Sequence, residues 1–424
     1  MPPPDHAAPG ATARRRDTMI AGRACTASSR HDRPRGSRVT IGLAGLALLG
    51  VLAPAAAGAA PASGPPLAIG LTENDPRLLM GDSPIWRAAV KVVALKPAYI
   101  RVLIPWERIQ PRGGRKPNWD APFGGCPKLI PGCRSERGMR GLLTAIKARQ
   151  AQDGGWKILA VPYFTPLWAV AGPPIGCQKA RNRHARAQMP RIAAYRRLLR
   201  AFNGLADKVG VRVDYITPWN EPNHPGFLQP QRARCVAPSK AIVPRAYARL
   251  VRAARQELRP GQTIVLGSLA GLQRPRVYGA GVAEFIRGLP RDVACVDGPF
   301  AQHAYVGVRG RDGAAPRAAD PISAARHELL DTVIRALDGK GCAQRKALWI
   351  AETGTFDHRC DAMSAALRSW SVNDRIDAAF QYTFRNDRRY PVGLVSSSLR
   401  DTFASYRAWY AFAGSPRQLP SNPC

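Results

Sequence analysis

The stretch YITPWNEPN, residues 215–223, decides the fold that we expect for this chain. Its short apolar run leads to a carboxylate, Glu221, which stands between an asparagine and a proline. A second stretch of the same design, LWIAETG at 348–354, ends in Glu352. Short apolar runs bounded by turn residues are typical of buried strands in parallel sheets. The two stretches therefore predict two strands that each carry one glutamate at the carboxyl end.

Similar apolar runs recur along the chain and alternate with longer segments rich in Ala, Arg and Leu. We expect strands at 67–71, 99–104, 157–162, 215–219, 263–267, 298–303, 347–351 and 379–383. We expect helices at 85–95, 138–150, 191–209, 244–258, 281–287, 323–337, 362–374 and 403–412. This alternation favours βα units and a parallel sheet. Eight units predict an α/β fold, a single (β/α)8 TIM barrel whose active site lies at the carboxyl ends of the strands.

The first 61 residues are predicted to lie outside the barrel. A basic region with RRR at 14–16 precedes the apolar run VTIGLAGLALLGVL at 39–52, and small residues follow at 55–60. This order is typical of a secretory signal. We therefore predict a basic N-terminal and signal segment at 1–61, a catalytic domain at 62–424, and a secreted or cell-envelope location. The alternative is an uncleaved membrane anchor, although a spanning helix needs about 20 mainly apolar residues.

The cysteine content agrees with export. Of nine cysteines, Cys25 falls in the signal segment and eight remain. An even number in an exported chain predicts disulfides. The expected pairs join regions that are neighbours in the predicted barrel: Cys126–Cys133, Cys177–Cys235, Cys295–Cys342 and Cys360–Cys424. No cysteine and histidine spacing matches a zinc site, so we expect no metal.

The chain is strongly basic, with 63 Lys and Arg against 29 Asp and Glu and a formal charge of +34. One interpretation is attraction to an anionic partner, such as an acidic polysaccharide or cell-wall polymer. The other is a solvated surface in a chain that favours Arg and Ala. No nucleic-acid module is present in the predicted mature part, which excludes nucleic acid as the expected partner. Nothing in the pattern predicts an obligate interface, so we expect a monomer.

With glutamates at the ends of the fourth and seventh predicted strands, the chain resembles the clan A retaining glycoside hydrolases, the cellulase-like (β/α)8 superfamily. The resemblance covers about residues 67–414, and its most specific part is WNEP at 219–222. It implies an O-glycosyl hydrolase that needs no cofactor, with Glu221 as general acid/base and Glu352 as nucleophile. The implied substrate is a poly- or oligosaccharide, cleaved by double displacement.

The same resemblance implies substrate-binding residues at other strand ends. Asn220 would contact the sugar 2-hydroxyl, and Arg101 would support the nucleophile. His303 and Tyr305, in AQHAY at 301–305, match a His-x-Tyr pair after the sixth strand.

Aromatic residues near the strand ends are further candidates. Trp168 and Trp106 follow the third and second strands, and an aromatic face can stack on the apolar face of a sugar. Both residues fit simple packing equally well. The family often has a tryptophan at the eighth strand, where AFQYTFRND at 379–387 offers Tyr382 and Phe384 instead.

Two physical expectations follow from the implied mechanism. The charge of Glu352 should raise the pKa of Glu221, which must be protonated to act as the acid. Retention predicts carboxyl groups about 5–5.5 Å apart. Two alternatives remain open: a non-catalytic carbohydrate-binding or cell-wall-associated barrel, and a transglycosylase in which a sugar hydroxyl replaces water.

Overall fold

The computed structural model describes residues 67–80, 83–122, 126, 128, 130–153, 155–172, 176–177, 185–236, 239–273, 278–306, 324–414 and 423–424. The signal segment and the domain boundary predicted at residues 61 and 62 fall outside these ranges, so both remain predictions.

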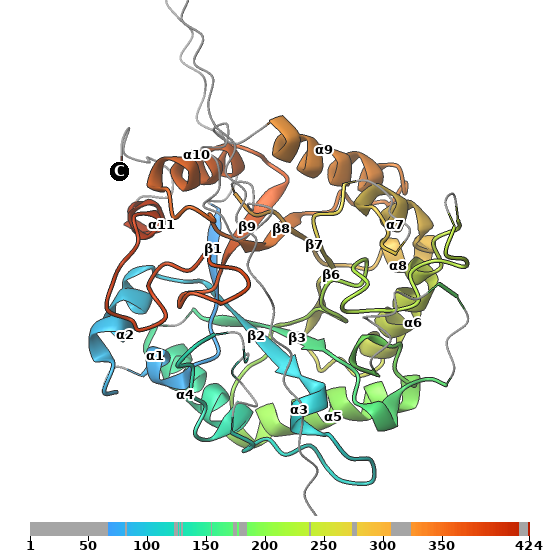
Figure 1. Ribbon diagram of the computed structural model, residues 1–424, viewed down its shortest axis with the longest axis horizontal. Helices are drawn as coiled ribbons and strands as arrows, with labels where there is room; N and C mark the ends of the chain where they lie inside the picture. Colours follow the sequence, from blue (N-terminus) through green and yellow to red (C-terminus); the bar gives the residue numbers. More distant parts are fainter. Residues whose placement is uncertain are drawn as a thin grey trace, which may run out of the picture. The chain divides into compact units, whose positions relative to one another are not determined.

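The strands form one parallel sheet at the centre of the described chain (Figure 1). They are β1 (Ala68–Thr72), β2 (Tyr99–Pro105), β3 (Lys157–Tyr163), β4 (Tyr215–Ile216), β5 (Thr263–Ile264), β6 (Leu266–Leu269), β7 (Phe300–His303), β8 (Leu348–Thr353) and β9 (Ile376–Tyr382). Their order is β5-β4-β3-β2-β1-β9-β8-β7-β6. The two ends of this order, β5 and β6, are consecutive in the chain, so the sheet closes on itself as a barrel.

Helices surround the strands (Figure 1). The long ones among the described residues are α2 (Trp86–Ala94), α4 (Gly138–Asp153), α5 (Ile192–Val209), α6 (Val243–Arg255), α7 (Val282–Gly288), α9 (Ala324–Asp338), α10 (Cys360–Ser371) and α11 (Ser405–Gly414). Short turns add α1 (Pro76–Leu79), α3 (Trp106–Ile109), α8 (Arg291–Ala294) and the 3₁₀ turns η1 (Leu167–Ala169) and η3 (Ala185–Ala187). Every predicted helix is present within a few residues of its expected bounds, and the predicted (β/α)8 barrel is confirmed.

The fifth strand differs from the prediction of one run at 263–267. It divides at Val265: β5 pairs with β4, and β6 pairs with β7. The Val265 amide donates to the Ile216 carbonyl at 3.0 Å, and the Leu266 amide donates to Pro299 at 3.0 Å. Gly267 follows in a left-handed conformation, φ 80°, where a side chain would meet the Ala301 carbonyl. The strand therefore turns from one neighbour to the other, which closes the barrel and bulges its carboxyl end.

The fourth strand is also shorter than the predicted 215–219. After Ile216 the chain continues beside β3, because Thr217 donates to Ala160 at 2.9 Å and Asn220 donates to Pro162 at 3.3 Å. This extension carries the chain to Glu221 at the carboxyl edge of the barrel.

The inside of the barrel is filled at the amino ends of the strands. Tyr99, Tyr215, Trp349 and Phe380 form a cluster in which the rings of Tyr99 and Trp349 lie 4.8 Å apart. Gly70 on β1 lies directly against the Phe380 ring, where an added Cβ would come within 2.2 Å of it. The carboxyl ends instead carry buried polar side chains, including Ser268, Gln302, His303, Glu352 and Thr353. The filled end supports the barrel, and the polar end is available for chemistry.

All four predicted disulfides are present: Cys126–Cys133, Cys177–Cys235, Cys295–Cys342 and Cys360–Cys424. Their Cα atoms lie between 4.7 and 5.8 Å apart, within the range of native bridges.

No helix among the described residues combines the length and the apolar character that crossing a bilayer requires.

Candidate active site

Glu221 and Glu352 meet at the carboxyl edge of the barrel. Glu352 lies within β8, and Glu221 follows the extension of β4. One oxygen of each carboxylate and a ring nitrogen of His303 lie within 4.8 Å of one another. The Glu352 side chain is 8% exposed and that of Glu221 is 12% exposed. Two nearly buried carboxylates thus approach each other across the carboxyl end of the barrel, from strands that are not adjacent in the sheet.

The Glu221 backbone is held by its neighbours in a conformation that non-glycine residues seldom adopt, with φ 42°. Its amide donates to the Ser268 carbonyl at 2.9 Å, and its carbonyl accepts from the His224 amide at 2.9 Å. These contacts from β6 and from the following turn compensate the strain, a situation that is common at functional sites.

Arg101 on β2 is fully buried and joins two of the predicted site residues. Its Nη1 atom lies 2.7 Å from Glu352 Oε1, and its Nη2 donates to Asn220 Oδ1 at 2.7 Å. The guanidinium therefore places a positive charge beside Glu352 and fixes the amide of Asn220. The structure brings together these residues from β2, from the β4 extension and from β8.

His303, at the end of β7, lies between the two glutamates. Its Nδ1 is 2.9 Å from Glu221 Oε1 and 3.3 Å from Glu352 Oε2. Its Nε2 is 2.8 Å from Ser268 Oγ. The ring is 1% exposed, so each ring nitrogen is satisfied by protein.

The Tyr305 hydroxyl donates to Glu352 Oε2. Burial, reinforced by the charge of Glu352, raises the pKa of Tyr305 well above its usual value. Tyr305 therefore stays protonated and acts as a hydrogen-bond donor to the carboxylate over the accessible pH range.

The pKa of Glu221 departs from the prediction of a raised value. Burial has the largest single effect and raises it, but the hydrogen bond and charge of His303, together with the charges of His224 and Arg101, lower it by more in total. The net result is a pKa of Glu221 below its ordinary value of 4.5. The expectation is wrong because it counted the nearby carboxylate and left out His303, which contacts the Glu221 carboxylate, and the charges of His224 and Arg101.

A group of aromatic rings adjoins Glu352, and we call it the tyrosine wall: Tyr305, Tyr382, Tyr390 and Phe356. The ring of Tyr305 stacks on that of Tyr390 at 5.4 Å and meets that of Tyr382 edge-on at 6.3 Å. The Tyr382 hydroxyl donates to Asp387 Oδ2 at 3.0 Å. Asp387 is 2% exposed, and burial raises its pKa.

A second group adjoins Glu221, and we call it the phenylalanine wall: Phe164, Phe227, His224 and Arg186. The rings of Phe164 and Phe227 are stacked at 5.4 Å with an interplanar angle of 11°. The His224 ring lies 5.9 Å from Phe227, and the Arg186 guanidinium lies 5.2 Å above Phe164. Phe164 has φ 61°, a rare conformation for a bulky residue. Arg186 is exposed and, within the described chain, makes no ion pair.

Other predicted aromatic residues have different surroundings. Trp106 is fully buried and meets Trp168 edge-on at 5.9 Å. Trp168 packs against the outer core, and its indole nitrogen donates to the Gln110 carbonyl at 2.8 Å. These contacts favour packing over sugar binding for Trp168. Phe384 is fully buried in the same core, so Tyr382 is the residue that reaches the site from the eighth barrel position.

Sequence reasoning missed Ser268, His224 and the phenylalanine wall. Ser268 lies in β6, the second half of the divided fifth strand, and no motif in the sequence marks that division. Phe164 stands in VPYFTPLW at 161–168, where the aromatic content was visible but its direction was not. The signal that could have found His224 is its place three residues after Glu221, one turn away from the carboxylate.

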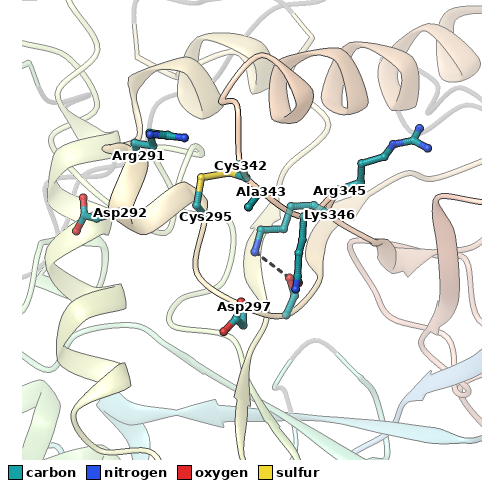
Figure 2. Close-up of a pocket in the computed structure, with 10 residues that line it drawn as sticks. Arg291, Asp292, Cys295, Asp297, Cys342, Ala343, Arg345 and Lys346 are labelled. Atoms are coloured by element: carbon teal, nitrogen blue, oxygen red, sulfur yellow. Dashed lines mark hydrogen bonds between the residues drawn. A yellow bond between two sulfur atoms is a disulfide. The ribbon is translucent and has the colours of Figure 1, made fainter.

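A separate cavity of about 510 Å³ lies at the opposite end of the barrel, before β7 and β8. Figure 2 shows its lining around the Cys295–Cys342 disulfide, with Lys346 Nζ donating to the Gly298 carbonyl at 3.2 Å. The cavity mixes cations and acids, and neither catalytic candidate lines it. The amino-terminal face of such barrels usually serves stability, so we do not include this cavity in the site.

Comparison with known proteins adds the fold relationship. No protein-family model and no curated protein sequence matches the chain. Among solved structures, a GH39 enzyme from Xanthomonas axonopodis pv. citri is similar with a TM-score of 0.53 and 15% identity, covering 85% of this chain and 70% of that one. The fold that the two chains share is the (β/α)8 barrel. The fold resemblance predicted from the sequence is thus confirmed.

Two further structures have the same fold. A monomeric β-xylosidase from Caulobacter crescentus CB15 is 17% identical with a TM-score of 0.51, covering 83% of this chain and 69% of that one. A GH5_18 variant from Bifidobacterium longum, in complex with Manb1-4GlcNAc, is 13% identical with a TM-score of 0.50, covering 84% and 80%. The chain spans 63% of the length of a family 39 glycoside hydrolase from Bacteroides cellulosilyticus WH2. At these identities, the fold is what the chain shares with them.

Proposed function

We propose that this chain is a secreted retaining glycoside hydrolase that cleaves an O-glycosidic bond of a poly- or oligosaccharide. The observation that carries the proposal is the pair of carboxylates with oxygen atoms within 4.8 Å of each other. A short separation supports retention, since an inverting enzyme needs room for a water between groups about 6.5–9.5 Å apart.

In the first step Glu352 attacks the anomeric carbon, and the bond from that carbon to the leaving oxygen breaks. Glu221 donates its proton to the leaving oxygen and becomes a carboxylate. The sugar is now an ester of Glu352. In the second step Glu221 takes a proton from water, the resulting hydroxide attacks the same carbon, and Glu352 departs as a carboxylate. Both glutamates return to their starting states.

The neighbours of the pair fit these roles. Arg101 and Tyr305 contact Glu352, which must be an anion when it attacks. Arg101 also occupies Oδ1 of Asn220. The amide group of Asn220 that remains to bind a sugar hydroxyl is therefore Nδ2, which suits an interaction with the 2-hydroxyl.

Each wall adjoins a different glutamate, and in the proposed mechanism the two glutamates act on different parts of the substrate. The tyrosine wall adjoins Glu352, the group that holds the sugar during the reaction, through Tyr305. The phenylalanine wall adjoins Glu221, the group that protonates the departing oxygen, through His224. We therefore assign the tyrosine wall to the retained sugar and the phenylalanine wall to the leaving group.

The charge of the chain and the position of Arg186 support an anionic substrate. A strong excess of Lys and Arg attracts polyanions, and an exposed guanidinium on the leaving-group side offers them a contact. Four disulfides support an oxidising compartment. We propose an extracellular monomer made from a precursor with a cleaved signal.

The test is sugar release by protein beginning at Ala62, measured on neutral and acidic polysaccharides and on aryl glycosides. Glu352→Ala and the exposed, distant Asp374→Asn serve as the matched pair of variants. We expect release by the native chain and by Asp374→Asn, with none by Glu352→Ala, and a product that first keeps its anomeric configuration. Glycan binding without release would establish a non-catalytic barrel instead. A larger yield of new glycosides than of free sugar, with sugar acceptors present, would establish a transglycosylase.

A further inference from the structure

Ser268, in β6, contacts two residues of the proposed active site, Glu221 and His303. It is fully buried, with φ 54°, at the bulge where β6 pairs irregularly with β7. Its carbonyl accepts the Glu221 amide at 2.9 Å. Its hydroxyl lies 2.8 Å from Nε2 of His303, whose other nitrogen faces both glutamates. Ser268 thus contacts both the backbone of Glu221, the proposed acid/base, and the His303 ring that lies between the two carboxylates.

We propose that Ser268 is a positioning residue that keeps Nδ1 of His303 directed at the two carboxylates in both protonation states of the ring. This inference rests on the proposed function, because it assigns Ser268 a part in the same reaction. A serine hydroxyl can donate to a neutral Nε2 and can accept from a protonated one. An alanine here would leave Nε2 without its partner in a pocket where the ring is 1% exposed.

The bridge matters because the negative charge moves during the reaction. Before attack the anion is Glu352, and in the ester intermediate it is Glu221. The distances from Nδ1 to the two carboxylates, 2.9 and 3.3 Å, differ by only 0.4 Å. A small tilt of the ring therefore transfers the Nδ1–H hydrogen bond from one anion to the other. Ser268 holds the ring at Nε2, while Nδ1 changes its hydrogen-bond partner between Glu352 and Glu221.

The ring contacts Glu221 and Glu352 through Nδ1 and Ser268 through Nε2. Tyr305 and Arg101 contact Glu352, and the charge of His224 acts on Glu221. Ser268 Oγ is the hydrogen-bond partner of the ring at Nε2, on the side away from the glutamates. When the serine oxygen is removed, the rotation of the ring is no longer fixed on that side. The contact from Nδ1 to Glu221 should then loosen, and its lowering effect on the pKa of Glu221 should weaken.

The experiment compares Ser268→Ala and Ser268→Gly with a matched control. Both variants lack the hydroxyl, and glycine tolerates the left-handed backbone without strain, so it separates the hydroxyl from the fold. The control is Ser405→Ala, a buried serine whose hydroxyl has no hydrogen-bond partner within the described chain.

The first readout is independent of turnover: the ring ¹⁵N chemical shifts of His303 by NMR, assigned with His303→Ala. We expect the Nε2 resonance to move in both Ser268 variants because its hydrogen bond to the hydroxyl is lost, and the Nδ1 resonance to move as its contact with the glutamates loosens. Both resonances in Ser405→Ala should equal those of the native protein. An unchanged Nδ1 resonance in both Ser268 variants would overturn the proposal, whether or not the chain hydrolyses glycosides.

The second readout is steady-state kinetics on the substrate found above. We expect kcat to fall about tenfold with KM changed less than twofold, and the alkaline limb of kcat/KM to move to higher pH. Ser268→Ala combined with His303→Ala should be no slower than His303→Ala alone, because the serine acts through the histidine. If the losses of kcat in the two single variants added up in the double variant, the coupling through His303 would be overturned. If activity were lost only in Glu352→Ala, the proposed function would stand and Ser268 would have no role in it.

Discussion

The tyrosine wall and the phenylalanine wall face the same pair of glutamates but differ in chemistry. The tyrosine wall carries hydroxyl groups, one bonded to Glu352 and one to the buried Asp387. The phenylalanine wall carries stacked apolar rings beneath an exposed guanidinium. Directional hydrogen bonds suit a sugar that must be held in one orientation, whereas stacking and charge tolerate variable partners. Under the proposed function, we expect strict recognition of the retained sugar and looser, charge-selective recognition of the leaving group.

The largest effect should come from the tyrosine side. Glu352→Ala removes the nucleophile, and we expect turnover to fall about 10⁴-fold or more on every substrate, since no other group can form the ester. The measurement is initial rate on an aryl glycoside and on a natural glycan. Folding is checked by thermal unfolding against Asp374→Asn. A residual rate within tenfold of native would remove Glu352 from this role.

The corresponding change on the phenylalanine side should depend on the substrate. Glu221→Ala should reduce the rate about 10²- to 10⁴-fold on glycans, whose leaving alcohols need a proton. The loss should be much smaller on dinitrophenyl glycosides, whose leaving group departs unprotonated. Equal losses on both substrate types would contradict the assignment of Glu221 and its wall to the leaving group.

The pH dependence should reflect the lowered pKa of Glu221. The acid must be protonated in the free enzyme, so its contribution is complete below the pKa and is lost as the pH rises through it. We expect kcat/KM to be greatest at acid pH, below the ordinary carboxyl value of 4.5, and to fall about tenfold per pH unit above it. His303→Gln removes the largest lowering influence while burial persists, so its alkaline limb should move upward. A native limb above pH 6 would show that the cations do not control Glu221.

Tyr305→Phe tests the hydrogen bond between the tyrosine wall and the nucleophile. The variant keeps the ring contacts and loses only the donor to Glu352. We expect kcat/KM to fall about 10- to 100-fold, the range for a hydrogen bond to a charged group. Tyr382→Phe, which loses the bond to Asp387 instead, serves as comparison, and its effect should fall mainly on the choice of sugar. If the two variants showed the same loss of kcat/KM and the same preference among sugars, Tyr305 and Tyr382 would not have separate roles in holding the nucleophile and selecting the sugar.

The smallest effect is expected at the edge of the phenylalanine wall. Arg186→Gln should raise KM severalfold for an anionic glycan and leave a neutral aryl glycoside unchanged. Added salt should reduce the native advantage, because exposed charges are screened. Arg249→Gln, an exposed cation on α6, is the matched control. A uniform change on neutral and anionic substrates would indicate packing on Phe164 rather than recognition of charge.

Several features followed from the sequence alone because they depend on local pattern. Alternating apolar runs and helical segments predicted eight βα units, and the structure has them within a few residues. The strand ends bearing Glu221 and Glu352 were visible for the same reason. The four disulfides could be paired because a barrel makes loops of consecutive units neighbours.

Other features were decided only by the tertiary structure. The fifth strand divides at Val265 because each half must pair with a different neighbour, and local apolar content does not encode that choice. This division places Ser268 beside β7, in contact with His303. The two walls are formed by loops that are far apart in the chain. The pKa of Glu221 was predicted in the wrong direction because it depends on the sum of all nearby charges. A sequence shows which residues carry charge and which segments are apolar, but folding alone brings His303, His224 and Arg101 to one carboxylate.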